Sequence, residues 1–95
     1  MSGEDRRDYR EPEKAAIDVS GDDLKGQPFE EQAETVNISV VGLSFYLKTP
    51  INVQTFIFVD LTRSKEFGYL GKVHALVVRI ETSSPEKNLV AAKFI

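Results

Sequence analysis

Apolar and polar residues alternate along much of this chain, and a period of two is typical of β-strands that bury one face. Six segments carry the pattern, at about residues 14–20, 33–40, 43–47, 54–62, 69–82 and 89–95. Glycine, proline, serine and aspartate residues that favour turns stand between several of them. No segment repeats its apolar residues with the period of a helix. The pattern therefore predicts an all-β fold.

The alternation in the second segment predicts where its side chains lie. Val36, Ile38 and Val40 fall on one face and are expected to share an environment. Asn37 and Ser39 then lie side by side on the opposite face. We therefore expect a polar pair on the surface of this strand.

The fourth segment is apolar on both faces. Ile57, Val59 and Leu61 form one face, and Phe56 and Phe58 form the other. Two interpretations of the phenylalanines remain open. Either both pack in the interior or beneath a helix outside this chain, or they form an exposed apolar patch of the kind at which proteins dock.

Six short antiparallel strands joined by turns favour a closed barrel, because closure leaves fewer exposed strand edges. The alternation in the fifth segment is irregular between Lys72 and Val78, so we expect a β-bulge there. Residues 1–13 are densely charged and contain little to bury. They predict a flexible arm ahead of a barrel domain that covers residues 14–95.

Composition narrows the possible functions. The 95 residues suit one small domain, and a net charge of −3 argues against binding to a nucleic acid polymer. The chain has no cysteine and one histidine, which excludes disulfides, thiolate metal sites and a Cys–His dyad. His74 stands in mid-strand among apolar residues and is expected to be structural. The acidic pairs Asp22–Asp23 and Glu30–Glu31 fall in predicted polar loops, where we expect them to be solvated. Because the sequence also shows no glycine-rich phosphate loop and no metal-ligand spacing, we expect no enzymatic activity, metal or cofactor.

Two short motifs carry the candidate chemistry. Arg6 and Arg10 have the spacing Arg-x-x-x-Arg, and Asn37, Ser39 and Gly42 have the spacing Asn-x-Ser-x-x-Gly. Their order, ahead of several further strands, resembles the PilZ domain, which is the bacterial receptor module for cyclic di-GMP. The resemblance covers nearly the whole chain and implies a six-stranded antiparallel barrel of PilZ type.

The resemblance also implies a role for each motif residue. Arg6 and Arg10 would contact a phosphate and a guanine edge of cyclic di-GMP, since a guanidinium matches both in its forked geometry. Asn37 and Ser39 would hydrogen-bond the ligand from the barrel. Gly42 would permit an unusual backbone dihedral and a close approach of the ligand.

Further expectations concern the arginine segment and its surroundings. Arg7 would add a contact, and Asp5 would repel a second stacked nucleotide, which favours one ligand per domain. Binding would order the arm as a switch that is read by a neighbouring domain or a protein partner. No stretch approaches the roughly 18 apolar residues that span a membrane, so we expect no membrane insertion. The lack of cysteine and of a signal-peptide core fits the cytoplasm, and the resemblance implies a bacterial one.

Three features depart from the commoner family pattern. Ala92 replaces a glycine that the last strand often carries, and the chain ends at Phe94 and Ile95 where many members continue into a helix. The second motif begins with Asn37 in place of the commoner aspartate, which the family pattern permits.

Two other functions compete with nucleotide binding. The main alternative is a PilZ adaptor that acts through protein contacts without a nucleotide. A small oligonucleotide-binding barrel is disfavoured by the acidic balance.

Overall fold

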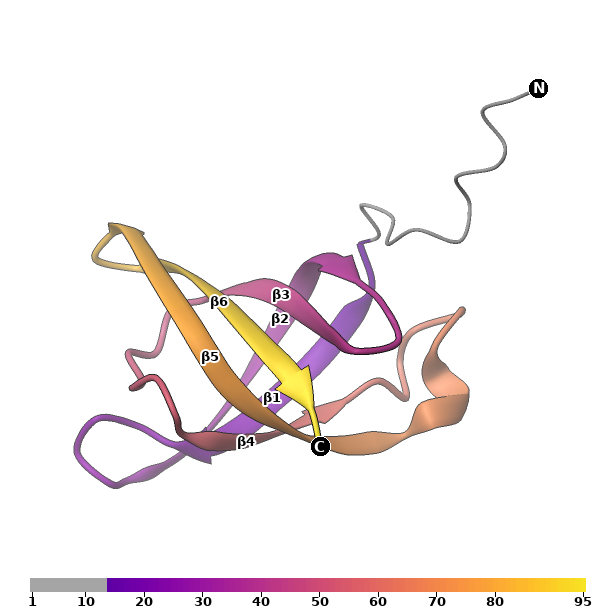
Figure 1. Ribbon diagram of the computed structural model, residues 1–95, viewed down its shortest axis with the longest axis horizontal. Helices are drawn as coiled ribbons and strands as arrows, with labels where there is room; N and C mark the ends of the chain where they lie inside the picture. The colour runs from indigo at the N-terminus through magenta and orange to yellow at the C-terminus, as the bar shows by residue number, and fades with distance from the viewer. Residues whose placement is uncertain (1–13) are drawn as a thin grey trace.

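The computed structural model describes residues 14–95 and is a closed, six-stranded antiparallel β-barrel (Figure 1). Its strands are β1 (Ala16–Asp22), β2 (Pro28–Ile38), β3 (Gly42–Leu47), β4 (Phe56–Asp60), β5 (Lys72–Ser84) and β6 (Lys87–Phe94). A short 3-10 turn, η2 (Gly68–Leu70), precedes β5. Around the barrel the strands follow the order β1-β2-β3-β6-β5-β4. The prediction of an all-β barrel is confirmed, and the predicted arm of residues 1–13 lies outside the described residues.

The barrel interior contains the apolar residues that alternate along each strand. Ile57, Val59 and Leu61 are fully buried, as the pattern of the fourth segment predicts. Phe45 of β3 is the largest fully buried side chain, and burial of a side chain of this size stabilises the fold by about 1.5–3 kcal/mol. The core is continuous across all six strands. It provides a rigid support for the polar residues outside it.

The second strand differs most from its prediction. It begins at Pro28, five residues before the predicted start at 33, and ends at Ile38, so Ser39 and Val40 lie outside it. Glu30 and Glu31 therefore belong to a strand and not to a polar loop. This part of β2 pairs with the end of β1, and Phe29 and Ala33 pack against the core. Three polar residues separate these two apolar ones, so the apolar pattern is too sparse to reveal this part of the strand.

A β-bulge in β2 corrects the predicted alternation. Thr35 pairs with Phe45 and Asn37 pairs with Ser44, so Val36 is an extra residue opposite β3. Thr35 and Ile38 are buried on either side of the bulge, while the two residues between them are half-buried. The expectation that Val36, Ile38 and Val40 share one face is therefore wrong.

The bulge expected in the fifth segment is present at Val78. Val77 pairs with Ala92 and Arg79 pairs with Ala91, which leaves Val78 without a counterpart on β6. The side chain of Val78 is exposed, whereas Val77 is fully buried. The bulge thus restores the inward alternation of the long strand β5.

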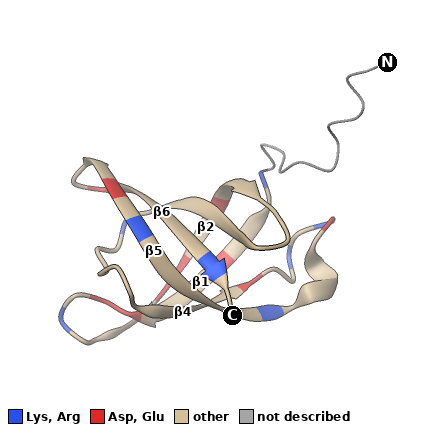
Figure 2. Ribbon diagram, viewed as in Figure 1, with Lys and Arg blue, Asp and Glu red and all other residues tan. Residues whose placement is uncertain are grey.

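Charged residues of both signs are distributed over the barrel (Figure 2). Residues of the two signs are interspersed along the described strands, in agreement with the small net charge of the chain. Along residues 14–95, no helix has the length and apolar character needed to cross a membrane.

Candidate functional site

The bulge in β2 determines the position of Asn37. Because Val36 is the extra residue, Val36 and Asn37 are neighbours between two inward-facing residues. Asn37 pairs with Ser44 of β3, so two polar side chains stand on adjacent strands. Asn37 keeps the half-exposed environment that its predicted role requires, although a bulge and not a regular alternation produces it.

Ser39 shapes the turn that joins β2 to β3. Its amide donates a hydrogen bond to the carbonyl of Gly42 at 2.8 Å, which closes a two-residue loop of Val40 and Val41. The Ser39 hydroxyl accepts a hydrogen bond from the Val41 amide at 3.2 Å and lies 3.4 Å from the Gly42 carbonyl oxygen. Val40 at the tip of this loop is 94% exposed. Ser39 therefore already has a structural task in the absence of a ligand.

Gly42 is required by packing and not by its dihedral angles. Among the described residues, positive φ angles occur at Gly26, Gln54 and Gly71, and Gly42 is not one of them. A Cβ atom at Gly42 would overlap the carbonyl oxygen of Ala92 on β6 and would lie 3.0 Å from the Cα of Lys93. The expected unusual dihedral is therefore wrong. Instead, the absent side chain lets β3 approach the backbone of β6 closely.

Hydrogen bonds connect the start of the described chain to the part of β2 that contains the bulge. Ala15 lies just before β1 and exchanges two hydrogen bonds with the buried residue Thr35 of β2. Thr35 directly precedes the bulge that positions Asn37. Lys14 is thereby placed near Val36, immediately before the second motif, although the two residues are far apart in the sequence. The predicted ligand residues Arg6, Arg7 and Arg10 lie outside the described residues.

A hollow of about 430 Å³ lies between the start of the described chain and strands β2 and β3. It is lined by Lys14, Glu34, Thr35, Val36 and Tyr46. Ligand pockets in proteins commonly have volumes of roughly 300–1,000 Å³, so the hollow is large enough for part of a nucleotide. Neither Glu34 nor Tyr46 belongs to one of the two sequence motifs. Both stand in ordinary strand segments, and only the bulge and the β2–β3 pairing bring them together.

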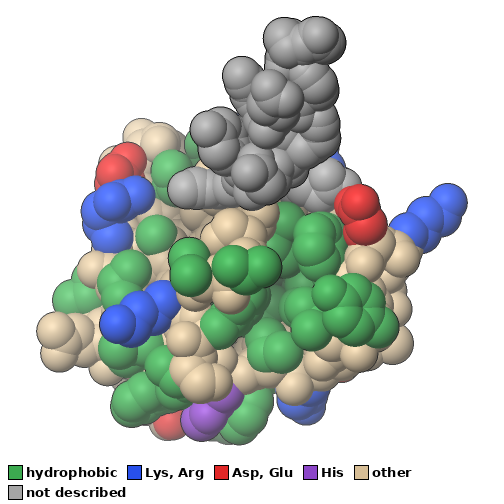
Figure 3. Space-filling view, turned by 45° about the vertical axis from the view of Figure 1, so that its right-hand side comes forward, with side chains coloured by type: hydrophobic (Ala, Val, Ile, Leu, Met, Phe, Trp, Pro, Cys, Tyr) green, Lys and Arg blue, Asp and Glu red, His purple; other side chains and the backbone are tan. Residues whose placement is uncertain are grey.

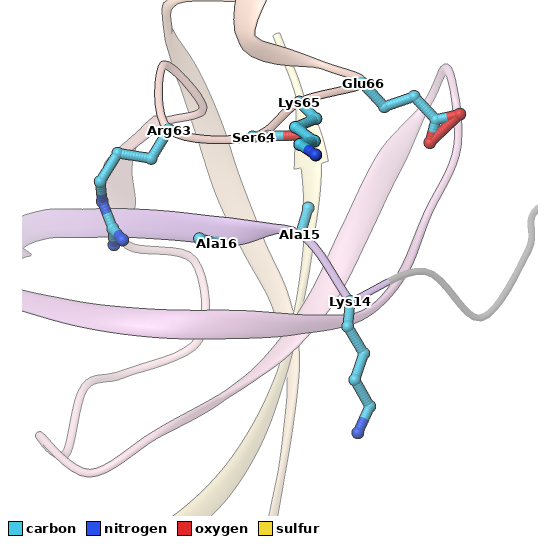
Figure 4. Close-up of a pocket in the computed structure, with 7 residues that line it drawn as sticks. All are labelled: Lys14, Ala15, Ala16, Arg63, Ser64, Lys65 and Glu66. Carbon is cyan, nitrogen blue, oxygen red and sulfur yellow. The ribbon is translucent and has the colours of Figure 1, made fainter.

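A second hollow, of about 530 Å³, lies between the start of β1 and the loop after β4 (Figure 4). Its charged lining residues are Lys14, Arg63, Lys65 and Glu66. In Figure 4 these side chains point in different directions and do not converge on one position. The hollow therefore offers no focused site for an anion, despite its larger volume.

Arg63 has a structural partner. Its Nε and one terminal nitrogen each donate a hydrogen bond of 3.1 Å to Asp18, and that terminal nitrogen also donates one to the Ile17 carbonyl. The hydrogen bond to Asp18 raises the pKa of the guanidinium above its already high usual value. The forked geometry fastens the loop after β4 to β1.

Asp60 ends β4 and caps the first turn of the following loop. The Thr62 hydroxyl and the Thr62 amide both donate hydrogen bonds to its carboxylate. These bonds hold the pKa of Asp60 below its usual range, and Lys72 and Arg63 act in the same direction more weakly. Asp60 and Arg63 therefore serve the loop and are not free for ligand chemistry.

Glu31 has a comparable structural role at the other end of β3. Its carboxylate accepts hydrogen bonds from the amides of Lys48 and Thr49 at 2.7 and 3.0 Å, and from the Thr49 hydroxyl at 2.7 Å. Asp23 likewise accepts hydrogen bonds from two amides of the β1–β2 turn, those of Lys25 and Gln27. Neither carboxylate is a free acid or base.

The outer face of β4 and β5 carries exposed aromatic side chains. Phe56 is 56% exposed and Phe58 is 43% exposed, which excludes the interpretation that they fill the barrel interior. His74 of β5 is also exposed and stacks on Phe58, with ring centroids 4.4 Å apart and an angle of 2° between the planes. Figure 3 shows the histidine next to hydrophobic side chains at the lower edge of that view. We call Phe56, Phe58 and His74 the aromatic face.

Two lysines border the aromatic face. The Nζ atom of Lys72 lies 5.7 Å from the centroid of the Phe58 ring, within the range of a cation–π interaction. Lys93 of β6 pairs with Leu76, which in turn pairs with Phe56. An apolar surface with a basic margin therefore lies on β4 and β5, and Lys93 in that margin pairs with Gly42 of β3.

Within residues 14–95, no three histidine, aspartate or glutamate side chains lie close enough together to hold a metal ion.

A scan against models of known protein families gives no match to this chain, and a search of curated proteins gives none either. The fold and the geometry at the β2 bulge are thus the basis for a functional proposal.

Proposed function

We propose that this protein is a PilZ-type receptor that binds cyclic di-GMP in the bacterial cytoplasm. The proposed ligand residues are Arg6, Arg10, Asn37, Ser39 and Gly42. Arg7 is an additional candidate contact. The proposal is for a binding protein without a catalytic step.

One observation supports the proposal above the others. The hydrogen bonds between Ala15 and Thr35 bring the start of the described chain beside the Asn37 bulge, with a hollow between them. A ligand in this region lies within reach of residues on both sides of the junction. The pairing of β1 with β2 thus brings the first described residues, Lys14 and Ala15, to the part of β2 that carries Asn37.

Cyclic di-GMP has the chemistry that such a site requires. Each guanine presents O6 and N7 as two acceptors for one arginine, and each phosphodiester accepts a bidentate pair of arginine N–H groups. Asn37 and Ser44 add hydrogen-bonding groups from β2 and β3. In this proposal Gly42 acts indirectly, because its close packing against Ala92 fixes the turn that carries Ser39.

Calorimetric titration with cyclic di-GMP tests the proposal. We expect saturable binding at micromolar concentration or tighter, about −8 kcal/mol or stronger, with one nucleotide per chain. Arg6→Ala and Arg10→Ala should each weaken binding by about 1.5–3 kcal/mol, the range for a hydrogen bond to a charged group. GTP serves as the control ligand, and Lys25→Ala on the distant β1–β2 turn is a matched control for the loss of a positive charge. Absence of heat at high ligand concentration would refute the proposal.

The aromatic face supports a second candidate function, that of an adaptor without a nucleotide. Phe56 and Phe58 are exposed on a rigid pair of strands, and Lys72 and Lys93 border them. This surface fits a partner segment whose apolar side chains are flanked by acidic ones. A Phe56→Ser, Phe58→Ser variant that keeps cyclic di-GMP binding but loses cellular signalling would assign the output to this face. A protein that binds no nucleotide, yet still loses signalling in that variant, would be an adaptor alone.

A further inference from the structure

The hollow beside the β2 bulge contains a carboxylate for which the motifs provide no role. Glu34 is exposed on the outer face of β2, immediately before Thr35, and lines the hollow together with Tyr46 of β3. Within residues 14–95, Glu34 forms no side-chain hydrogen bond or ion pair. This separates it from Glu31 on the same strand, whose carboxylate is fully engaged by Lys48 and Thr49.

A carboxylate in a guanine-binding region has a specific chemical use. The Watson–Crick edge of guanine carries two neighbouring donors, N1–H and the N2 amino group, and a carboxylate accepts both in parallel. Adenine presents an acceptor, N1, at the corresponding position and would face the carboxylate with an unfavourable lone pair. An arginine on O6 and N7 uses the opposite edge of guanine, so both contacts can be made at once.

The remaining lining residues fit a base at this position. The Tyr46 ring provides an aromatic surface. The Nζ atom of Lys87 lies 4.9 Å from the centroid of this ring, and the resulting cation–π interaction stabilises the position of the ring. Val36, which the bulge turns out of the core, provides an apolar contact. Lys14 adds a positive charge to the lining, which favours an anionic ligand. A planar, partly apolar group with donors on one edge therefore matches this lining.

We propose that the hollow lined by Glu34, Val36 and Tyr46 is a guanine subsite in which Glu34 reads the Watson–Crick edge and so selects guanine over adenine. This inference rests on the proposed cyclic di-GMP function and adds a determinant of specificity to it. Glu34 belongs to neither of the two motifs.

The test compares cyclic di-GMP with cyclic di-AMP on the full chain, in the wild type and in Glu34→Gln. The wild type should bind cyclic di-GMP at least about 100-fold more tightly than cyclic di-AMP, because an unmatched polar edge is strongly penalised. Glutamine keeps the size of glutamate but presents one acceptor and one donor, which matches the edge of adenine. Glu34→Gln should weaken cyclic di-GMP binding by about 10- to 150-fold, the range for a lost charge-assisted hydrogen bond, and should strengthen cyclic di-AMP binding.

Two controls separate this inference from the function on which it rests. Glu30→Gln removes a carboxylate from the exposed part of the same strand, away from the hollow, and should leave both affinities unchanged. The NMR signals of the Val36 methyl groups and the Tyr46 ring should shift on addition of cyclic di-GMP. If Glu34→Gln binds cyclic di-GMP as tightly as the wild type, the guanine subsite is refuted while the receptor stands. If the wild type binds neither nucleotide, both proposals fail.

Discussion

Thr35 of β2 and Ala15, which precedes β1, are joined by two hydrogen bonds. The Thr35 hydroxyl accepts a bond from the Ala15 amide at 2.9 Å, and the Thr35 amide donates to the Ala15 carbonyl at 3.0 Å. Thr35 is 2% exposed and directly precedes the bulge at Val36. One buried residue thus connects the start of the described chain to the strand position that carries Asn37.

Replacement of Thr35 by valine should destabilise the barrel by about 1–3 kcal/mol, because the buried amide of Ala15 would lose its partner while the shape of the side chain is retained. Urea denaturation measures the free energy of unfolding. Hydrogen exchange of the Ala15 amide should accelerate in the same variant. Thr35→Ser keeps the hydroxyl and should keep the Ala15 amide protected. Equal exchange rates at Ala15 in the wild type and in Thr35→Val would contradict this role of the hydroxyl.

Gly42→Ala should destabilise the protein by about 1–3 kcal/mol, the usual effect of forcing an added carbon into a packed region. The new Cβ would meet the backbone of Ala92 and Lys93, which cannot move aside as a flexible side chain can. Thermal unfolding measures the effect, with Gly26→Ala as the comparison. Gly26 has open space around it but a φ of 78°, so its substitution introduces backbone strain without a clash. Loss of the β3–β6 amide protection in Gly42→Ala alone would identify the clash as the cause.

Neighbouring residues on the two faces of β4 should respond very differently to truncation. Ile57→Ala should cost about 2–5 kcal/mol because Ile57 is fully buried in the core. Phe58→Ala removes a larger side chain but should cost less than about 1.5 kcal/mol, since the loss is mainly its stacking on His74. Urea denaturation of the two variants checks this order. The ring protons of His74 should also shift in the NMR spectrum of Phe58→Ala, and a reversed order of stabilities would show that Phe58 is covered in solution.

Asp60 should contribute to the acid limb of the stability curve. The Thr62 hydroxyl and amide lower the pKa of Asp60 in the folded state, so its stabilising contribution is present above the unfolded pKa of about 4. The contribution is lost as the pH falls toward the lower folded pKa. The difference in unfolding free energy between the wild type and Asp60→Asn should therefore be present at pH 6 and decrease as the pH falls below about 4. A difference that does not change between these pH values would show that the carboxylate charge is not involved.

The sequence by itself determines the fold class and most of the core of this protein. Alternation with a period of two identifies buried residues such as Ile57 and Val59, because each strand must turn its apolar side chains inward. It also indicates the bulge at Val78, where the alternation breaks visibly. These features depend on neighbours along the chain, so they can be inferred from one strand at a time.

The tertiary structure alone decides how the candidate site is assembled. The bulge at Val36 follows from the pairing of β2 with β3, and the requirement for Gly42 follows from the approach of β6. Glu34 and Tyr46 come together because their strands meet across that pairing, and the exposure of Phe56 depends on what covers β4. Each of these properties depends on residues that are distant in sequence. A local hydrophobic pattern cannot encode them, because it reports only which face of its own strand a residue occupies.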